Sequence, residues 1–193
     1  DLMQSIIDHQ HELAEKYIPI EKKNGLCLYD QIPGDIDNPK AQARIKDMSW
    51  RAVEEVAEAF EAFAAGDKLH FLEELADALH FLAEKYLICG FKPKYPLANY
   101  FKLAAQVDYG TRMDSYVGRF TVACGLTCNC LKNKPWKQSQ MLTDVNLFNE
   151  LLEVEFSEFI VLCYHAGFED DKSLYDMYIR KNQVNQFRQR SNY

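Results

Sequence analysis

The feature that most constrains this fold is the spacing of apolar residues, which recur at three- and four-residue steps along nearly the whole chain. That spacing predicts helices, because 3.6 residues per turn bring such positions onto one face. We find no convincing two-residue alternation of the kind that marks a half-buried strand. Gly66, Gly90 and Gly167 follow three of the apolar stretches, as glycines that end helices do. The sequence therefore predicts an all-α helical bundle of about six to seven helices.

Capping residues and chain breaks bound the expected helices. A loop rich in Pro, Gly and Asp is expected from Pro19 to Pro39, and Thr111 with Asp114 fits a capping box. The helices are expected at about 1–17, 47–66, 68–90, 97–107, 111–131, 144–166 and 171–190. We expect one domain over residues 1–193, with about 92–140 left open as a subdomain or insertion.

Charge and cysteine content exclude several classes of function. The net charge of −7 disfavours a nucleic-acid polymer as partner, because such binders usually present a basic face. An acidic protein can still bind phosphates through a metal ion or a local basic cluster. No apolar run approaches the length of a membrane helix, and the first residues lack a signal-peptide layout. Six scattered cysteines indicate reduced thiols, so we expect a cytoplasmic protein, in the host cytoplasm if it is viral.

Two pairs of acids stand on consecutive expected helices. Glu55 and Glu58 are three residues apart on the second helix, and Glu74 and Asp77 repeat that spacing on the third. Residues three apart lie on the same side of a helix, and the short turn at 65–67 makes the two helices antiparallel neighbours. The third helix is otherwise mostly apolar, so its covered acids repel one another and lose hydration. A hard divalent cation such as Mg²⁺ compensates such a cluster and can hold a polyphosphate.

Other interpretations of these residues stay open. One ExxE pair alone is more typical of a solvated helix face. Asp77 and His80 form the acid–histidine pair of a di-iron bundle, but we find no second ExxH. A helical interaction protein with a decayed site is a third alternative, although all four acids are present. The CxxxCxC run at 124–130 is the one metal-like spacing among the cysteines, and there we favour buried thiols over zinc.

ExxE followed by ExxD on consecutive helices resembles the signature of the all-α NTP pyrophosphatase superfamily. The continuation from Asp77 to Phe81 is similar to the D-x-x-H-F of the dimeric dUTPases and of the phage dCTPase–dUTPases. The resemblance implies a homodimer that hydrolyses dUTP to dUMP and pyrophosphate. It also implies that the catalytic acids are Glu55, Glu58, Glu74 and Asp77. These acids would bind two or three Mg²⁺ ions, and the ions would hold the deoxynucleoside triphosphate.

The last expected helix carries a second and longer similarity. Lys181, Asn185 and Arg188 fall on one stripe at helical spacing, with Asn182 and Gln189 beside it. Cations suit phosphate oxygens, and amides suit hydroxyl groups or base edges. On charge alone, a solvated basic helix is the alternative. The string 181–193 resembles the K-N-x-x-N-x-x-R-Q-x-x-x-Y that closes dimeric dUTPases, which implies that these five residues bind substrate.

Three further residues are expected at the nucleoside. Gln10 stands where the family has a glutamine that approaches the base. The alternative interpretation of Gln10 is a polar residue at the edge of the core. His80 belongs to the D-x-x-H-F string. If Glu84 lines the base pocket, its carboxylate accepts a hydrogen bond from the amine of cytosine and repels the carbonyl of uracil. Alternatively, Glu84 pairs with Lys85, Arg188 or solvent. The expected substrate is dUTP, with dCTP, both nucleotides, or a broader house-cleaning range as alternatives.

Overall fold

The computed structural model describes residues 1–25, 30–134 and 136–191 of the chain. Within these residues it contains seven helices and no strand, so the predicted all-α fold is confirmed. The helices are α1 (Leu2–Lys23), α2 (Pro39–Ala64), α3 (Lys68–Cys89), α4 (Leu97–Ala104), α5 (Met113–Asn129), α6 (Val145–Ala166) and α7 (Asp171–Arg190). None of the described helices combines the length and apolar character that crossing a membrane requires.

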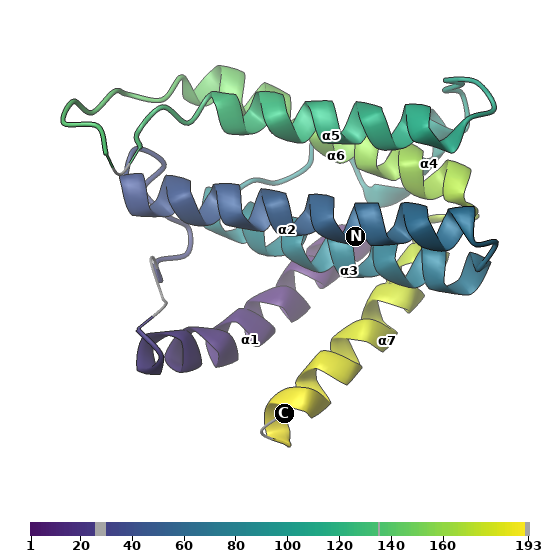
Figure 1. Cartoon of the computed structure of the whole chain (residues 1–193), viewed down its shortest axis with the longest axis horizontal. Helices are drawn as coiled ribbons and strands as arrows, with labels where there is room; N and C mark the ends of the chain where they lie inside the picture. The colour runs from purple at the N-terminus through teal and green to yellow at the C-terminus, as the bar shows by residue number, and fades with distance from the viewer. Residues whose placement is uncertain (26–29, 135, 192–193) are drawn as a thin grey trace.

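The centre of the fold is the antiparallel hairpin of α2 and α3, which run side by side in Figure 1. Gly66 has a φ of +77°, a left-handed conformation that makes the reversal between the two helices. Asp67 then caps α3, because its carboxylate accepts from the backbone N–H of His70 at 3.1 Å. The predicted stop at Gly66 and the predicted cap at Asp67 are therefore both confirmed.

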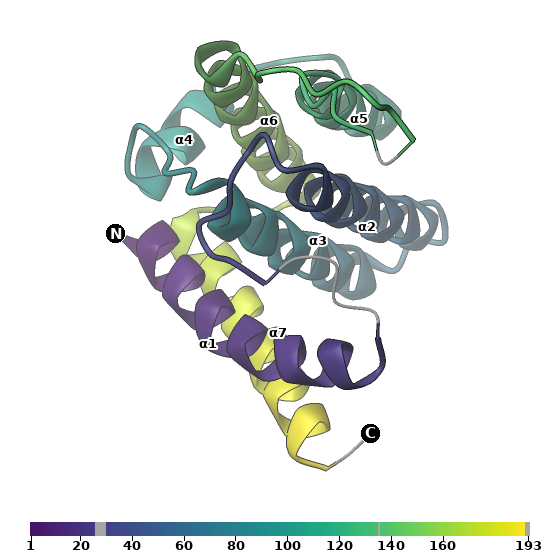
Figure 2. The same cartoon turned by 90° about the vertical axis from the view of Figure 1, so that its left-hand side faces the viewer.

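The remaining helices form layers on either side of this hairpin (Figures 1 and 2). On one side, α6 packs against α5 and α4, and α5 also contacts α2. On the other side, α1 and α7 pack against α3 and against each other. The layer of α5 and α6 buries Phe120, Phe148, Phe156 and Phe159, and the layer of α1 and α7 buries Ile6, Leu13 and Tyr178. The layer of α1 and α7 matters for function, because it covers the face of α3 that carries the acid pair.

One buried ion pair joins the third helix to the far layer. Lys85 on α3 and Glu155 on α6 are both fully buried, and the Lys85 Nζ lies 2.8 Å and 2.6 Å from the two Glu155 oxygens. The hydroxyl of Tyr86 also donates to Glu155, at 3.4 Å. Lys85 therefore points away from the face of α3 that α1 and α7 cover.

Two expected boundaries and one expected cap are wrong. Helix α1 continues through Pro19 to Lys23. Proline has no N–H for the carbonyl one turn before it, but that part of α1 lies at the surface, where water can bind the carbonyl. Helix α2 begins at Pro39, with Asn38 as its N-cap accepting from the Lys40 N–H at 2.9 Å. The expected capping box at 111–114 is not formed, because α5 begins at 113 and its N-cap, Arg112, makes no side-chain capping bond.

Candidate active site

A cavity of about 450 Å³ lies between α1, α2, α3 and α7. Its lining combines acids, bases and apolar side chains from these four helices: Gln10, Leu13, Tyr17, Glu21, Asp47, Met48, Arg51, Glu55, Asp77, His80, Phe81, Glu84, Asn185 and Arg188. Because α2 and α3 are antiparallel, Glu55 and Asp77 lie toward one end of the cavity, and Met48 and Glu84 lie toward the other. The cavity is therefore acidic at one end and mixed at the other.

Three of the four predicted acids meet at the acidic end. One carboxylate oxygen from each of Glu55, Glu58 and Glu74 lies within 4.8 Å of the other two. Glu74 is buried, Glu55 is half-buried and Glu58 is exposed. The spacing of three residues on α2 and the antiparallel approach of α3 produce this group. Among the described residues it is the group of carboxylate, thiol or imidazole side chains that is arranged to hold a metal ion.

The electrostatics of this group favour a cation. Burial, a hydrogen bond with Glu74 and the charges of Asp77, Glu74 and Glu58 raise the pKa of Glu55 to about 8. A carboxyl group keeps its proton up to an unusually high pH when the negative charges around it outweigh the positive ones. Oxygen ligands, crowding and excess negative charge are what a Mg²⁺ site requires, so the donor set fits this ion.

Asp77, the fourth predicted acid, forms an ion pair with a lysine. Its Oδ2 lies 2.6 Å from the Nζ of Lys181 on α7. Burial opposes the charge of Lys181, but Asp77, Glu74 and Glu73 together raise its pKa above the usual value. Glu74 similarly faces His70, whose Nδ1 lies 3.1 Å from it. Lys181 thus places one positive charge from the last helix beside the acids of α2 and α3.

His80 lies one turn beyond Asp77 and is buried against α7. Its Nδ1 is 2.9 Å from the carbonyl of Ala76, and its ring stacks on Tyr178 with centroids 4.2 Å apart. Burial lowers the pKa of His80 to about 4, so the ring is neutral at physiological pH. The Nδ1 therefore carries the proton that Ala76 accepts, and Nε2 is an acceptor. No described residue donates to Nε2, although it is buried.

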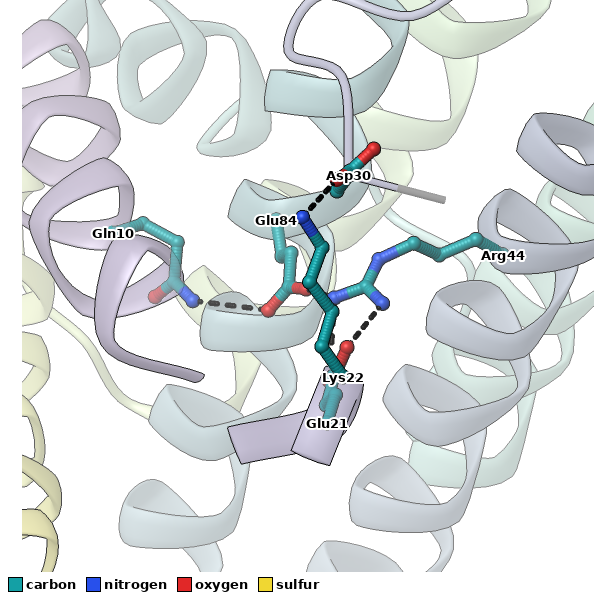
Figure 3. A network of polar contacts seen from close by, with 6 residues as sticks. All are labelled: Gln10, Glu21, Lys22, Asp30, Arg44 and Glu84. Carbon is teal, nitrogen blue, oxygen red and sulfur yellow. Dashed lines mark hydrogen bonds and ion pairs between the residues drawn. The ribbon is translucent and has the colours of Figure 1, made fainter. Parts of the chain in front are cut away.

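A polar network closes the other end of the cavity (Figure 3). Arg44 on α2 binds Glu84 on α3 at 2.5 Å and Glu21 on α1 at 2.7 Å. Gln10 on α1 reaches the second oxygen of Glu84 at 3.4 Å. The expected alternative partner Lys85 does not bind Glu84, because it pairs with Glu155 on the opposite side of α3. Leu13, Met48 and Phe81 line the cavity as apolar side chains.

The C-terminal helix presents its predicted residues in two ways. Asn185 and Arg188 line the cavity, and Lys181 reaches it through Asp77. Asn182 is buried behind them, and its side-chain oxygen accepts from Gln186 at 3.3 Å. Gln189 hydrogen-bonds the hydroxyl of Tyr17, which is a cavity residue. The terminal Tyr193 of the recognised string lies outside the described residues.

Several residues that line the cavity or contact its lining were not predicted from the sequence. Arg44 lies before the expected start of the second helix, and Glu21 lies beyond the expected end of the first helix, so neither had a helical face to be placed on. Arg51 did carry a signal, because it precedes Glu55 by four residues and shares its side of the helix. Tyr178 likewise precedes Lys181 by three residues on the last helix.

Comparison with known proteins identifies one family. A family model described as dUTPase matches residues 53–193 of the chain. Neither the curated proteins nor the solved structures provided a match. The matched range contains both acid pairs and the C-terminal string, whereas Gln10, Glu21 and Arg44 precede it.

Proposed function

The chain belongs to the dUTPase family and is a nucleoside triphosphate pyrophosphatase, and we propose that it hydrolyses dUTP to dUMP and pyrophosphate with Mg²⁺. One observation carries this proposal: the cavity that Glu55 and Asp77 line at one end continues into a space lined by both polar and apolar side chains at the other. A triphosphate requires the acidic, metal-binding end, and a base with its deoxyribose suits the remainder. Glu84 lies seven residues beyond Asp77, which separates the two ends by about 10 Å along α3.

Glu55, Glu58, Glu74 and Asp77 are the residues we propose to hold two or three Mg²⁺ ions. When bound, Mg²⁺ supplies charge neutralisation of the triphosphate and lowers the pKa of a coordinated water. The close approach of three of these carboxylates and the raised pKa of Glu55 support this assignment. Asp77 joins the set when Lys181 turns from it toward phosphate.

The residues of this chain then have separate tasks. One carboxylate of the cluster accepts the proton of the attacking water, which is the role of a general base. Lys181 and Arg188 stabilise the negative charge that grows on the phosphate oxygens. Both positions suit this role, because Lys181 already binds a carboxylate oxygen in the site and Arg188 lines the cavity.

The nucleoside is assigned to the mixed end of the cavity. Gln10, His80 and Asn185 offer hydrogen bonds there, and Leu13, Met48 and Phe81 offer apolar contact. We assign Asn182 and Gln189 to this end through their neighbours, since Asn182 bonds Tyr178, which stacks on His80, and Gln189 bonds Tyr17. The unpartnered Nε2 of His80 supports a ligand that donates a hydrogen bond to this nitrogen.

A second candidate substrate is dCTP, alone or together with dUTP. Glu84 lines the cavity, and its second oxygen accepts a single, long hydrogen bond from Gln10. That oxygen can accept from the exocyclic amine of cytosine. A broader house-cleaning range is the remaining alternative, since the acids and cations recognise only the triphosphate.

The test is product analysis of each deoxynucleoside triphosphate with Mg²⁺. We expect dUMP and pyrophosphate from dUTP, and no turnover when a chelator removes the metal. Release of single phosphate would contradict the proposal and indicate a phosphatase instead. The relative kcat/KM of dUTP and dCTP then ranks the two substrates.

Two further properties belong to the proposal. We assign a homodimer, which family resemblance supports and light scattering of the purified protein measures. We assign a cytoplasmic location, which the cysteine thiols support, since a reducing compartment keeps them free. A monomer in solution at micromolar concentration would contradict the first assignment.

A further inference from the structure

Arg44 is a buried arginine whose charge is shared between two carboxylates of different helices. It is 7% exposed, and its guanidinium lies 2.5 Å from Glu84 on α3 and 2.7 Å from Glu21 on α1. Buried arginines are rare unless they are paired in this way. Arg44 precedes residue 53, where the family match begins, so family membership assigns it no role.

The pairing with Arg44 determines which part of Glu84 remains available. Arg44 engages Oε1 of Glu84, while Oε2 receives one bond of 3.4 Å from the Nε2 of Gln10. Figure 3 shows Gln10 and Arg44 approaching this carboxylate from opposite sides. Oε2 therefore keeps free acceptor capacity at the cavity wall, since a carboxylate oxygen accepts more than one hydrogen bond.

The same carboxylate fixes the orientation of the Gln10 amide. An ionised Glu84 can only accept hydrogen bonds. The NH₂ group of Gln10, rather than its carbonyl oxygen, must therefore face Glu84. The carbonyl oxygen of Gln10 then faces the hydroxyl of Tyr178 at 3.1 Å. An NH₂ group has two hydrogens, and no described residue accepts the second one. Gln10 and Glu84 together form a donor beside an acceptor, both of which line the cavity.

We propose that Arg44 is a positioning residue that sets base selectivity by holding Gln10 and Glu84 as a donor–acceptor pair of fixed order. This inference rests on the proposed function, because it assumes that a nucleobase occupies this end of the cavity. Uracil presents a carbonyl oxygen next to an N–H. Cytosine presents an amine next to a bare ring nitrogen, which is the opposite order. A pair of fixed order matches one edge and leaves buried groups unpaired against the other.

Loss of Arg44 removes what keeps this order. Burial raises the pKa of the Glu84 carboxyl, and the charge and hydrogen bond of Arg44 oppose that effect. Without Arg44, the buried carboxylate loses its counter-charge and takes up a proton or turns away. Gln10 can then turn over, because the hydroxyl of Tyr178 can donate to the carbonyl of Ile6 and accept from the NH₂ group of Gln10. The cavity can then satisfy either base edge, and discrimination falls.

The experiment compares kcat/KM for dUTP and dCTP in wild type, Arg44→Met and Arg44→Lys. We expect Arg44→Met to bring the ratio of the two values at least about tenfold closer to one, mainly through KM of the preferred nucleotide. Arg44→Lys keeps a charge and should retain part of the selectivity. Inhibition by inorganic tripolyphosphate should stay within about twofold of wild type, while inhibition by dUMP weakens. A merely structural defect would weaken both.

Lys46→Met is the matched control. Lys46 is a second cation of α2 and is half-buried, but its Nζ donates to the carbonyl of Leu131, away from the cavity. We expect its ratio to equal that of wild type. Circular dichroism and thermal unfolding identify a variant that fails to fold, in which case Arg44→Lys carries the test. An unchanged ratio in folded Arg44→Met, or a wild type that does not discriminate, overturns the inference. A wild type that hydrolyses neither nucleotide overturns the proposed function instead.

Discussion

The Nζ of Lys181 lies 2.6 Å from Oδ2 of Asp77, which joins the last helix of the chain to the acid pair of the third. More than one hundred residues separate the two in sequence, and they meet because α7 packs along the face of α3 that carries Asp77. In the metal-free protein the ammonium group balances part of the negative charge of the cluster. With a triphosphate in the cavity, we propose that the same group binds phosphate oxygens.

Replacement of Lys181 by Met should therefore lower activity without unfolding the protein. We expect kcat/KM for dUTP to fall by about 100-fold or more, because a preorganised donor to developing charge is lost. Steady-state kinetics measure this, and Lys172→Met provides the control. Lys172 is an exposed lysine of the same helix that pairs only with Asp176. Comparable losses in both variants would show that α7 needs its overall charge and not this contact.

Glu58→Gln should remove a proposed metal ligand at nearly constant volume. Glu58 is exposed and its carboxylate lies within 4.8 Å of those of Glu55 and Glu74. We expect a loss of at least about 100-fold in kcat at low Mg²⁺, since ligand and base chemistry depend on this charge. Glu61→Gln, an exposed acid one turn further along α2, should behave as wild type. Wild-type turnover in Glu58→Gln would mean that the metal lies elsewhere.

The stability of the metal-free protein should depend on pH through Glu55. Its pKa is about 8 in the folded protein against a usual 4.5, so the folded state retains a proton that the unfolded chain releases. Stability is therefore highest below pH 4.5 for this group and falls as pH rises toward 8. After discounting for solvent screening, we expect a loss of about 1–2 kcal/mol. Saturating Mg²⁺ should reverse the loss.

Urea unfolding at several pH values, with chelator and with Mg²⁺, measures this dependence. The unfolding free energy of Glu55→Gln should change less with pH than that of wild type over the same range, because the amide does not titrate. Since other groups titrate as well, the difference between the two proteins is the quantity to compare. A wild-type curve parallel to that of Glu55→Gln would contradict the assignment of the raised pKa.

Much of the fold follows from local signals in the sequence. The spacing of apolar residues places the helices, and Gly66, Gly90 and Gly167 each adopt positive φ where the sequence predicts a helix end. The errors are also local. Asn38 and Pro39 are a good N-cap and first helical residue, and their signal was outweighed by the Pro, Gly and Asp content of the segment.

The candidate site was predictable only where spacing on a single helix carries it. Glu55 with Glu58 is such a case, and so is Glu74 with Asp77, because three residues make one turn. The network around Arg44 was not predictable, since its members come from three helices whose mutual packing no local pattern specifies. The same holds for the contact between Lys181 and Asp77.

Arg188→Ala should separate triphosphate binding from nucleoside binding. Arg188 lines the cavity from α7 and is proposed to bind phosphate oxygens. We expect the affinity for a non-hydrolysable dUTP analogue to fall by about tenfold, and that for dUMP to change by no more than about twofold. Isothermal titration calorimetry with Mg²⁺ measures both. Equal losses would assign Arg188 to the nucleoside or to folding.

The buried pair of Lys85 and Glu155 yields a prediction about stability alone. Both side chains are fully buried, and burial opposes the charge of Lys85 while Glu155 raises its pKa above the usual value. Lys85→Met leaves the carboxylate of Glu155 without its counter-charge, which should cost about 3–5 kcal/mol of unfolding free energy. Adding Glu155→Gln removes that charge and keeps a partner for the hydroxyl of Tyr86, which now bonds Glu155. The double variant should therefore be more stable than Lys85→Met alone, as urea unfolding will measure. If Lys85→Met is within about 1 kcal/mol of wild type, the pair is not a significant part of the contact between α3 and α6.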